Sequence, residues 1–297
     1  VRVAVPDSTA ARAVEAIKKQ AGIPVVADIH FDYRLAVEAA EAGADKIRIN
    51  PGNIGGEDGV RAVAEVCRKK GIPIRIGVNS GSLEKDILAK HGGVTPDALL
   101  ESAMRHVRLL NKFDFDDICL SVKTSDVRLT IDACRLLSQA TDYPLHLGIT
   151  EAGTEYMGII KSSAGIGALL SEGIGDTIRV SLTAPPEREV KAGLAILKAL
   201  GLRASGADLI SCPTCGRTKI ELISIAEEVE RRLEKLDRPI TVAVMGCAVN
   251  GPGEAKRADF GIAGGDGEGV LFKKGLVVGK APMDKLVDAL IQLINES

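Results

Sequence analysis

Short runs of β-branched and aliphatic residues alternate with amphipathic stretches along the first two thirds of the chain. The runs typical of strands cover residues 1–5, 25–29, 47–50, 74–79, 118–123, 145–150 and 178–182. Regular alternation of strand and helix predicts a parallel sheet, and eight such units close a TIM-type barrel. Seven units are present and the chain opens directly on a strand, so we expect an α/β fold: a TIM-type (β/α)8 barrel that lacks its first strand and helix.

The alternation stops near residue 201. Beyond it the pattern predicts a strand, a loop with two cysteines, a helix over about residues 219–236, a strand over 240–246, a second loop, further strands to about 281 and a closing helix. We therefore expect two domains, with the barrel over residues 1–204 and a smaller α+β domain over residues 205–297.

Each predicted barrel strand has one aliphatic and one polar set of side chains, because successive residues point to opposite faces. The aliphatic set suits the surrounding helices. The polar set should line the interior near the carboxyl ends of the strands, where barrel enzymes carry their chemistry. It comprises Arg2, Asp28, His30, Arg48, Asn50, Arg75, Asn79, Ser121, Lys123, His146, Arg179 and Ser181.

This polar set is strongly cationic. Counted with Glu151, just beyond its strand, it holds five Arg or Lys and two acidic residues, whereas the whole chain has a net charge of -2. Crowded guanidinium groups are unfavourable unless an anion neutralises them, and they match phosphate oxygens well. The set predicts a site for a diphosphate-sized ligand, although any single arginine could instead pair with Asp28, Glu151 or a backbone carbonyl.

Some other residues have more than one possible role, or no expected role in the site. Lys123 could alternatively form a Schiff base, as in aldolase-type barrels, and His30 beside Asp28 could carry a proton. His91 and His106 lie outside the strand ends, and we expect them to be exposed. Cys67, Cys119 and Cys134 are expected to be buried small hydrophobic residues.

The remaining cysteines form a motif in the last third of the chain: Cys212-Pro-Thr-Cys215, then Cys247, then Glu254 after Gly-Pro-Gly. A structural zinc site uses the same first pair but needs four ligands, and the last histidine, His146, lies in the barrel. Three thiolates fit better with an iron–sulfur cluster whose fourth iron takes an oxygen ligand, for which Glu254 is the candidate.

Composition and charge limit the partners that the protein is expected to bind and the compartment in which it is expected to lie. The small net charge gives no general attraction to nucleic acid or anionic membranes, and no apolar stretch reaches 18 residues. The N-terminus has no signal-peptide pattern. We expect a protein of the bacterial cytoplasm, or of the plastid stroma in a plant-type host, that binds neither nucleic acid nor membrane.

Six segments together resemble the 4-hydroxy-3-methylbut-2-enyl diphosphate synthases, the iron–sulfur enzymes of the non-mevalonate isoprenoid pathway. The segments are VRVAVPD (1–7), ADIHFD (27–32), RINPGN (48–53), GVNSGS (77–82), CPTC (212–215) and MGCAVNGPGE (245–254). The match runs along essentially the whole chain, except that the family carries another strand and helix ahead of Val1.

The resemblance implies reductive ring opening and dehydroxylation of 2-C-methyl-D-erythritol 2,4-cyclodiphosphate, with flavodoxin or ferredoxin as the electron donor. It implies a [4Fe–4S] cluster on Cys212, Cys215, Cys247 and Glu254, and a homodimer in which the cluster domain of one subunit caps the barrel of its partner. By motif position, the substrate is bound by Arg2, Arg48, Arg75, Asn79, Lys123, Arg179, Ser181 and, beside the cluster, Asn250. Catalytic roles fall to Glu151, Glu254, Asp28 and His30.

Two other functions remain open from the residues alone. One is a phosphate-binding barrel lyase or transferase that uses Lys123, with a structural metal in the second domain. The other is a non-enzymatic, metal-stabilised electron carrier or interaction module, which would leave the cationic interior without a role.

Overall fold

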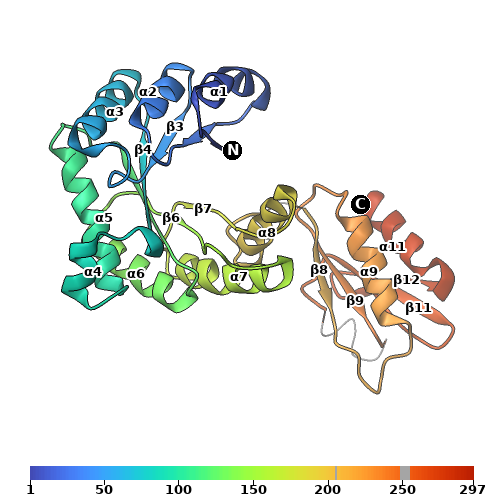
Figure 1. Cartoon of the computed structure of the whole chain (residues 1–297). Coiled ribbons are helices and arrows are strands. Elements are labelled where there is room, and N and C mark those ends of the chain that lie inside the picture. Colours follow the sequence, from blue (N-terminus) through green and yellow to red (C-terminus); the bar gives the residue numbers. More distant parts are fainter. Residues whose placement is uncertain (205, 248–254) are drawn as a thin grey trace. The chain divides into compact units, whose positions relative to one another are not determined.

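The computed structural model describes residues 1–204, 206–247 and 255–297, which form two compact units, Val1–Leu200 and Gly201–Ser297 (Figure 1). The predicted residues Asn250 and Glu254 lie outside the described residues. No helix among the described residues combines the length and the apolar character needed to cross a bilayer.

The first unit alternates strands and helices. Its elements are β1 (Arg2–Ala4), α1 (Ser8–Ala21), β2 (Val26–Asp28), α2 (Tyr33–Glu41), β3 (Lys46–Ile49), α3 (Gly56–Lys70), β4 (Ile74–Asn79), the 3-10 turn η1 (Ser80–Ser82), α4 (Lys85–His91), α5 (Pro96–Asn111), β5 (Ile118–Lys123), α6 (Val127–Ala140), β6 (His146–Leu147), α7 (Glu155–Ser171), β7 (Thr177–Ile178) and α8 (Pro186–Ala199). Several helices start at a side-chain cap: Asp7 accepts from Ala10 N and Asp126 from Leu129 N.

The strands of this unit pair only in parallel. β1 to β5 form one sheet in chain order, and β6 pairs with β7. A single parallel bridge between Leu120 of β5 and Leu145, just before β6, connects the sheet to this pair. This confirms the predicted α/β class with a parallel sheet. Among the described residues no pairing connects β7 with β1, and the expected eighth unit stays a prediction.

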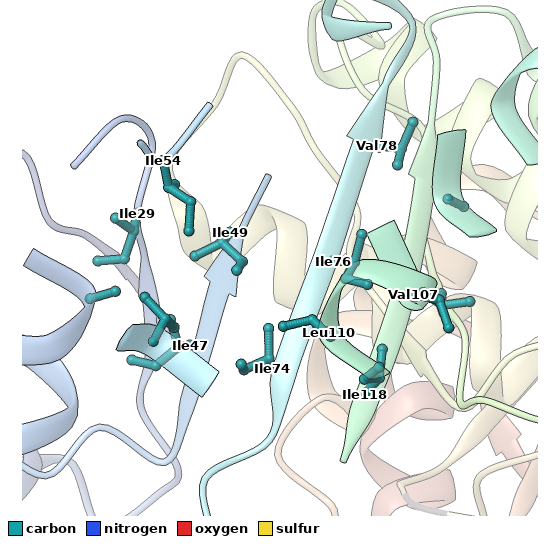
Figure 2. Close-up of a cluster of buried hydrophobic side chains, with 14 of the residues drawn as sticks. Ile29, Ile47, Ile49, Ile54, Ile74, Ile76, Val78, Val107, Leu110 and Ile118 are labelled. Carbon is teal, nitrogen blue, oxygen red and sulfur yellow. The ribbon is translucent and has the colours of Figure 1, made fainter. Parts of the chain in front are cut away.

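The aliphatic phase of the strands forms the core of the first unit (Figure 2). Ile47 is opposite Ile74 and Ile49 is opposite Ile76 in the ladder between β3 and β4, and all four are fully buried. Figure 2 shows Ile74 and Ile76 near Leu110 of α5. Burial of one such side chain contributes about 1.5–3 kcal/mol. Because this phase packs outward against helices, the opposite phase is left for the site.

The second unit has a mixed sheet and two longer helices. Its elements are β8 (Asp208–Ser211), α9 (Leu222–Leu233), β9 (Thr241–Met245), β10 (Phe260–Ala263), β11 (Glu268–Lys273), β12 (Leu276–Pro282), the 3-10 turn η2 (Met283–Lys285) and α11 (Leu286–Asn295). The strand order is β12-β11-β10-β9-β8, with β8, β9 and β10 parallel and the other pairs antiparallel.

The helix after the cysteine pair begins at Leu222, three residues later than the sequence pattern predicts. Lys219 N donates to Gly246 O (2.9 Å), so the backbone at Lys219 pairs with the residue after β9 and does not form helical hydrogen bonds. The core of this unit includes Val229 of α9, Val242 and Ile262 of the sheet and Leu290 of α11, all fully buried.

Candidate functional site

A cavity of about 310 Å³ in the first unit collects most of the predicted polar set. It lies toward the carboxyl ends of the strands, since it includes the last residues of β2, β4 and β5. The side chains that line it come from Arg2, Ala4, Asp28, His30, Arg48, Arg75, Asn79, Ser121, Lys123, Thr150 and Arg179.

Strand register explains why these residues meet. Asp28 is opposite Arg48, and Arg48 is opposite Arg75, so that one row of charge crosses three strands. Further along, Asn79 is opposite Lys123. Residues opposite each other in a ladder present their side chains on the same face. The parallel register therefore places the charged residues of consecutive strands in one cavity.

Asp28 is shared by two arginines. Its Oδ2 accepts from Arg2 Nη1 (2.7 Å) and its Oδ1 from Arg48 Nη1 (2.9 Å), and the carboxylate is buried. His30 Nε2 lies 3.9 Å from Asp28 Oδ2, too far for a hydrogen bond. Internal pairing, the alternative considered for any single arginine, thus applies to Arg2 and Arg48.

Arg75 and Lys123 differ, because neither side chain makes a hydrogen bond or ion pair with another described residue, although both backbones belong to the sheet. Their exposed fractions are only 7% and 5%. Burial lowers the pKa of Arg75 to about 10, and the neighbouring Arg2 and Arg48 add to this effect. Burial, followed by Arg179 and Arg75, holds the pKa of Lys123 well below its ordinary value. This part of the cavity holds basic groups without an anion, so an anionic ligand would favour their charged forms and be stabilised there.

Arg179 lies one residue beyond β7, which ends earlier than the sequence pattern predicts. Its N–H donates to Leu147 O (2.9 Å), so the backbone still follows β6, and its Nε donates to Ser181 Oγ (2.9 Å). Burial is the main cause of the lowered pKa of Arg179. Ser181 does not line the cavity and contacts it through Arg179.

Glycine creates the space beside Lys123. A Cβ on Gly148 would lie 2.6 Å from Arg179 O and 3.1 Å from Lys123 Cε. These distances are shorter than van der Waals contact, so only glycine lets the segments that follow β6 and β7 approach each other and the lysine so closely. The role of Gly148 could not be predicted from the sequence, because a glycine signals a close approach only when its neighbours across the sheet are known.

Besides Ser181, three residues of the predicted set counted with Glu151 lie outside the cavity lining. The Asn50 amide instead donates to Ser82 Oγ (3.1 Å), and its Oδ1 accepts from Gly52 N (3.1 Å), which organises the loop after β3. His146 is buried with Nδ1 2.8 Å from Thr177 Oγ1, and burial, aided by Lys123, lowers its pKa. Glu151 is exposed and has a left-handed backbone with φ of 52°, next to Thr150 of the lining.

The expectation that His106 is exposed is wrong. Its exposed fraction is 4%, its Nε2 lies 3.4 Å from Glu84 Oε1, and its Nδ1 has no hydrogen-bond partner among the described residues. Burial lowers its pKa. The signal was present in the sequence, since Leu99, Ala103, His106 and Leu110 recur at helical spacing on the buried face of α5. His91 is half-buried, with Nε2 2.7 Å from Glu101 Oε2.

Cys67, Cys119 and Cys134 are buried, as predicted. Burial raises the pKa of Cys67 and of Cys134 to about 12, which makes both thiols unreactive.

The other three cysteines lie in the loops that follow β8 and β9, two neighbouring strands of the second unit's sheet. Cys212 follows β8 and Cys247 lies two residues past β9, and the two strands are parallel neighbours. Gly246 N donates to Cys212 Sγ (3.1 Å). Cys215 N donates to Thr218 Oγ1 (3.1 Å), and that oxygen would be 3.0 Å from a Cβ on Gly246. Gly246, which directly precedes Cys247, thus contacts the segment that carries Cys212 and Cys215.

The chemistry of these donors fits a thiolate-bound group. Hydrogen bonds from the Arg217 backbone and side chain, and from Thr218, lower the pKa of Cys215. Sulfur atoms that accept such bonds are typical of iron–sulfur ligands. Among the described residues, no three His, Cys, Asp or Glu side chains are grouped closely enough to hold a metal ion, and the fourth expected ligand, Glu254, lies outside them.

Known proteins match this chain along its length. The GcpE TIM-barrel domain matches residues 1–194, and the GcpE protein C-terminal domain matches residues 208–296. The 4-hydroxy-3-methylbut-2-en-1-yl diphosphate synthase (flavodoxin) of Caldanaerobacter subterraneus subsp. tengcongensis is 61% identical over 296 residues, which are 100% of this chain and 83% of that protein.

Two further relatives carry the same name. The Clostridium tetani protein is 61% identical over 99% of this chain and 84% of its own length, and the Bacillus velezensis protein is 58% identical over 100% and 79%. A solved type I 3-dehydroquinate dehydratase from Clostridium difficile is 16% identical, with a TM-score of 0.46 over 66% of this chain and 76% of that one. Since both domain families match in order and cover nearly every residue, the chain belongs to the GcpE family.

Proposed function

We propose that this protein is a 4-hydroxy-3-methylbut-2-enyl diphosphate synthase. It would reduce 2-C-methyl-D-erythritol 2,4-cyclodiphosphate by two electrons, opening the ring and removing a hydroxyl group, with flavodoxin as the electron donor. Relatives 58–61% identical over nearly the whole chain carry this name. The observation that carries the proposal is the buried pair of basic side chains Arg75 and Lys123, which has no anionic partner among the described residues and so suits a diphosphate.

The cavity residues divide into two groups in this proposal. Arg75, Lys123 and Arg179 bind the diphosphate directly, because Asp28 neutralises none of them through a hydrogen bond. Arg2 and Arg48, held by Asp28, donate their remaining N–H groups, and Asn79 adds an amide. Ser181 positions Arg179. The ligand replaces water around fixed donors, so that its carbon end is oriented before the reaction starts.

The proposed cofactor is a [4Fe–4S] cluster bound by Cys212, Cys215, Cys247 and Glu254, with Asn250 beside it. When bound, such a cluster supplies electrons one at a time. The support from the described residues is the position of the cysteines in the loops after two neighbouring strands and the hydrogen bonds to Cys212 and Cys215.

Three side chains have proposed roles near the reacting carbons. Glu151 acts as an acid or stabilises positive charge, since it follows Thr150 of the cavity lining and is exposed. His30, half exposed at the cavity, carries a proton. Asp28 accepts from two arginines, and its role is therefore to position them.

We also propose that the enzyme is a homodimer of the bacterial cytoplasm. The support is the resemblance in sequence and the bacterial origin of the relatives. Light scattering of the protein in solution measures the mass, and a monomer at micromolar concentration would contradict the dimer.

Anaerobically purified protein tests the function. We expect a brown protein with about four iron and four sulfide per chain, and conversion of the cyclic diphosphate with reduced flavodoxin. Lys123→Met should keep the iron and sulfide and lose most conversion, whereas Lys85→Arg, at an exposed lysine, should change neither. One zinc per chain without colour, or no conversion by the iron-loaded protein, would contradict the proposal.

A further inference from the structure

Lys123 is a buried amine in a cavity that has room for a ligand. It ends β5 and is opposite Asn79 in the ladder, and its side-chain amine has no hydrogen bond or ion pair with another described residue. Its Nζ would be 3.2 Å from a Cβ on Gly148, so the missing side chain leaves the amine open on that side. Lys123 is also one of the residues that line the cavity.

The charged and titratable groups around this amine are mostly cationic. Arg75 lies on β4 and Arg179 beyond β7, and Arg2 and Arg48 are more distant cations of β1 and β3. The buried His146 of β6 and Cys134 of α6 also interact with Lys123. Asp28, the one carboxylate of the lining, is occupied by Arg2 and Arg48.

These surroundings favour the uncharged form of the amine while no anion is bound. Removal from water disfavours an ammonium ion, and adjacent guanidinium groups disfavour it further. An uncharged lysine has a free electron pair and is a nucleophile, which is how lysines next to other cations become reactive toward carbonyl groups. The same guanidinium groups bind phosphate oxygens. A molecule with both a carbonyl and a phosphate therefore matches this cavity at two points.

We propose that Lys123 makes this cavity a covalent capture site for phosphate-bearing aldehydes and ketones, which it binds as a reversible imine. The Nζ electron pair attacks the carbonyl carbon, and the carbonyl oxygen takes up a proton to give a carbinolamine. The carbon–oxygen bond then breaks, and the oxygen leaves as water with both protons lost by the amine. No electrons are gained or lost. Arg75 and Arg179 bind the phosphate.

This capture site requires the cationic cavity and no iron–sulfur chemistry, so it goes beyond the proposed function. It also makes such carbonyl compounds competitors of any diphosphate ligand, because both occupy the same guanidinium groups. An exposed lysine differs: Lys90, for example, donates to Glu101 (2.7 Å) at the surface, where water stabilises the ammonium.

Trapping with borohydride tests the proposal. The purified full-length holoprotein is incubated with glyceraldehyde 3-phosphate, reduced with borohydride, digested and mapped by mass spectrometry. We expect one stable adduct on the peptide that contains Lys123. Glyceraldehyde without the phosphate should label this peptide at least roughly tenfold less, because it lacks the charge-assisted contacts. Inorganic pyrophosphate should protect Lys123 in proportion to its occupancy.

Variants provide the matched comparison. Lys123→Arg and Lys123→Met should abolish the adduct, and Lys85→Arg should leave it unchanged. Circular dichroism checks that each variant is folded. Should both Lys123 variants unfold, pyrophosphate protection of the unaltered protein still decides. Labelling spread over exposed lysines, labelling that persists in a folded Lys123 variant, or equal labelling with and without the phosphate would overturn the proposal. Conversion of the cyclic diphosphate is measured separately, so the two proposals can fail independently.

Discussion

Arg48 lies against Gly77 of the neighbouring strand, so closely that a Cβ on Gly77 would be 2.6 Å from Arg48 Nη2 and 2.9 Å from its Cζ. The guanidinium group is held there by Asp28, whose Oδ1 accepts from Arg48 Nη1 (2.9 Å). The absence of a side chain at residue 77 thus fixes where one cation of the cavity lies.

Gly77→Ala should therefore displace Arg48 and weaken anion binding. Loss of one hydrogen bond between charged groups costs about 1.5–3 kcal/mol, so we expect roughly 10-fold to 100-fold weaker binding of inorganic pyrophosphate, measured by isothermal titration calorimetry. Gly81→Ala is the matched control, since a Cβ there would meet nothing within 4 Å. Equal affinity in the two variants would show that the position of Arg48 has no effect on anion binding.

Asp28→Asn should destabilise the protein and make its stability depend on anions. Removing the carboxylate charge leaves the largely buried Arg48 without its partner, which costs up to about 3–5 kcal/mol, whereas the exposed Arg2 adds little. Saturating pyrophosphate should restore much of this loss, because a ligand that binds only the folded protein stabilises it. Denaturant unfolding with and without pyrophosphate measures both effects.

The control for this change is Asp58→Asn, at an exposed residue that pairs with Arg61. Exposed pairs contribute only about 0–1 kcal/mol, so we expect little change. If the loss in Asp28→Asn were no larger, or were the same with and without pyrophosphate, Asp28 would have no role in arranging the cations.

The charged residues of the cavity could be predicted from the sequence because a strand alternates its faces with a fixed period of two. Arg48, Arg75 and Lys123 each fall in the polar phase of their strand, and the structure brings them together in one cavity. Pairing across strands could not be predicted in this way, since Asp28 reaches Arg48 only through the register of β2 on β3.

Gly77 and Gly148 were missed for a related reason. Each matters through a side chain on another strand, and a single sequence does not say which side chain approaches a glycine. His106 is a different case: its helical spacing with Leu99 and Leu110 was readable, and only the usual preference of histidine for the surface argued against burial.

Binding of a diphosphate should take up a proton through Lys123. Burial, Arg179 and Arg75 hold its pKa well below the ordinary value in the free protein, and a bound anion raises it. Lys123 therefore contributes fully to the affinity when the pH is below its pKa in the free protein. This contribution is lost as the pH rises through the higher pKa that Lys123 has in the complex. Calorimetry of pyrophosphate binding at about pH 8 in buffers of different ionisation enthalpy measures the uptake.

Lys123→Met should remove this proton uptake and leave only the protonation of pyrophosphate itself, whereas Lys85→Arg should keep it. Equal proton uptake in the Lys123→Met variant and the unaltered protein would mean that Lys123 is already charged before the ligand binds.

His106 should make the protein less stable in acid. Burial lowers the pKa of His106 in the folded state. Below the unfolded-state pKa of about 6.5, the unfolded chain therefore binds a proton at His106 more readily than the folded protein does, and the free energy of unfolding declines as the pH falls. His106→Gln should flatten the fall in the free energy of unfolding by up to about 1.4 kcal/mol per pH unit. His146, whose pKa burial also lowers, should keep part of the slope. Denaturant unfolding between about pH 7 and pH 5 gives the slope, and a slope in His106→Gln equal to that of the unaltered protein would contradict the prediction.

Glu151 offers a way to separate catalysis from binding. Its carboxylate is exposed and does not line the cavity, although the preceding Thr150 does. Glu151→Gln keeps the size of the side chain and removes its charge and acidity, so we expect unchanged pyrophosphate affinity, unchanged iron and sulfide content, and a kcat lowered by roughly 100-fold or more, as for other general acids. Glu155→Gln, four residues later at the start of α7 and 3.7 Å from Arg188, is the control and should retain full turnover. A normal kcat in Glu151→Gln would show that this residue takes no part in the reaction. A loss of pyrophosphate affinity that matches the loss of kcat would make it a binding residue, because an interaction that stabilises only the transition state changes turnover without changing the binding of a ground-state anion.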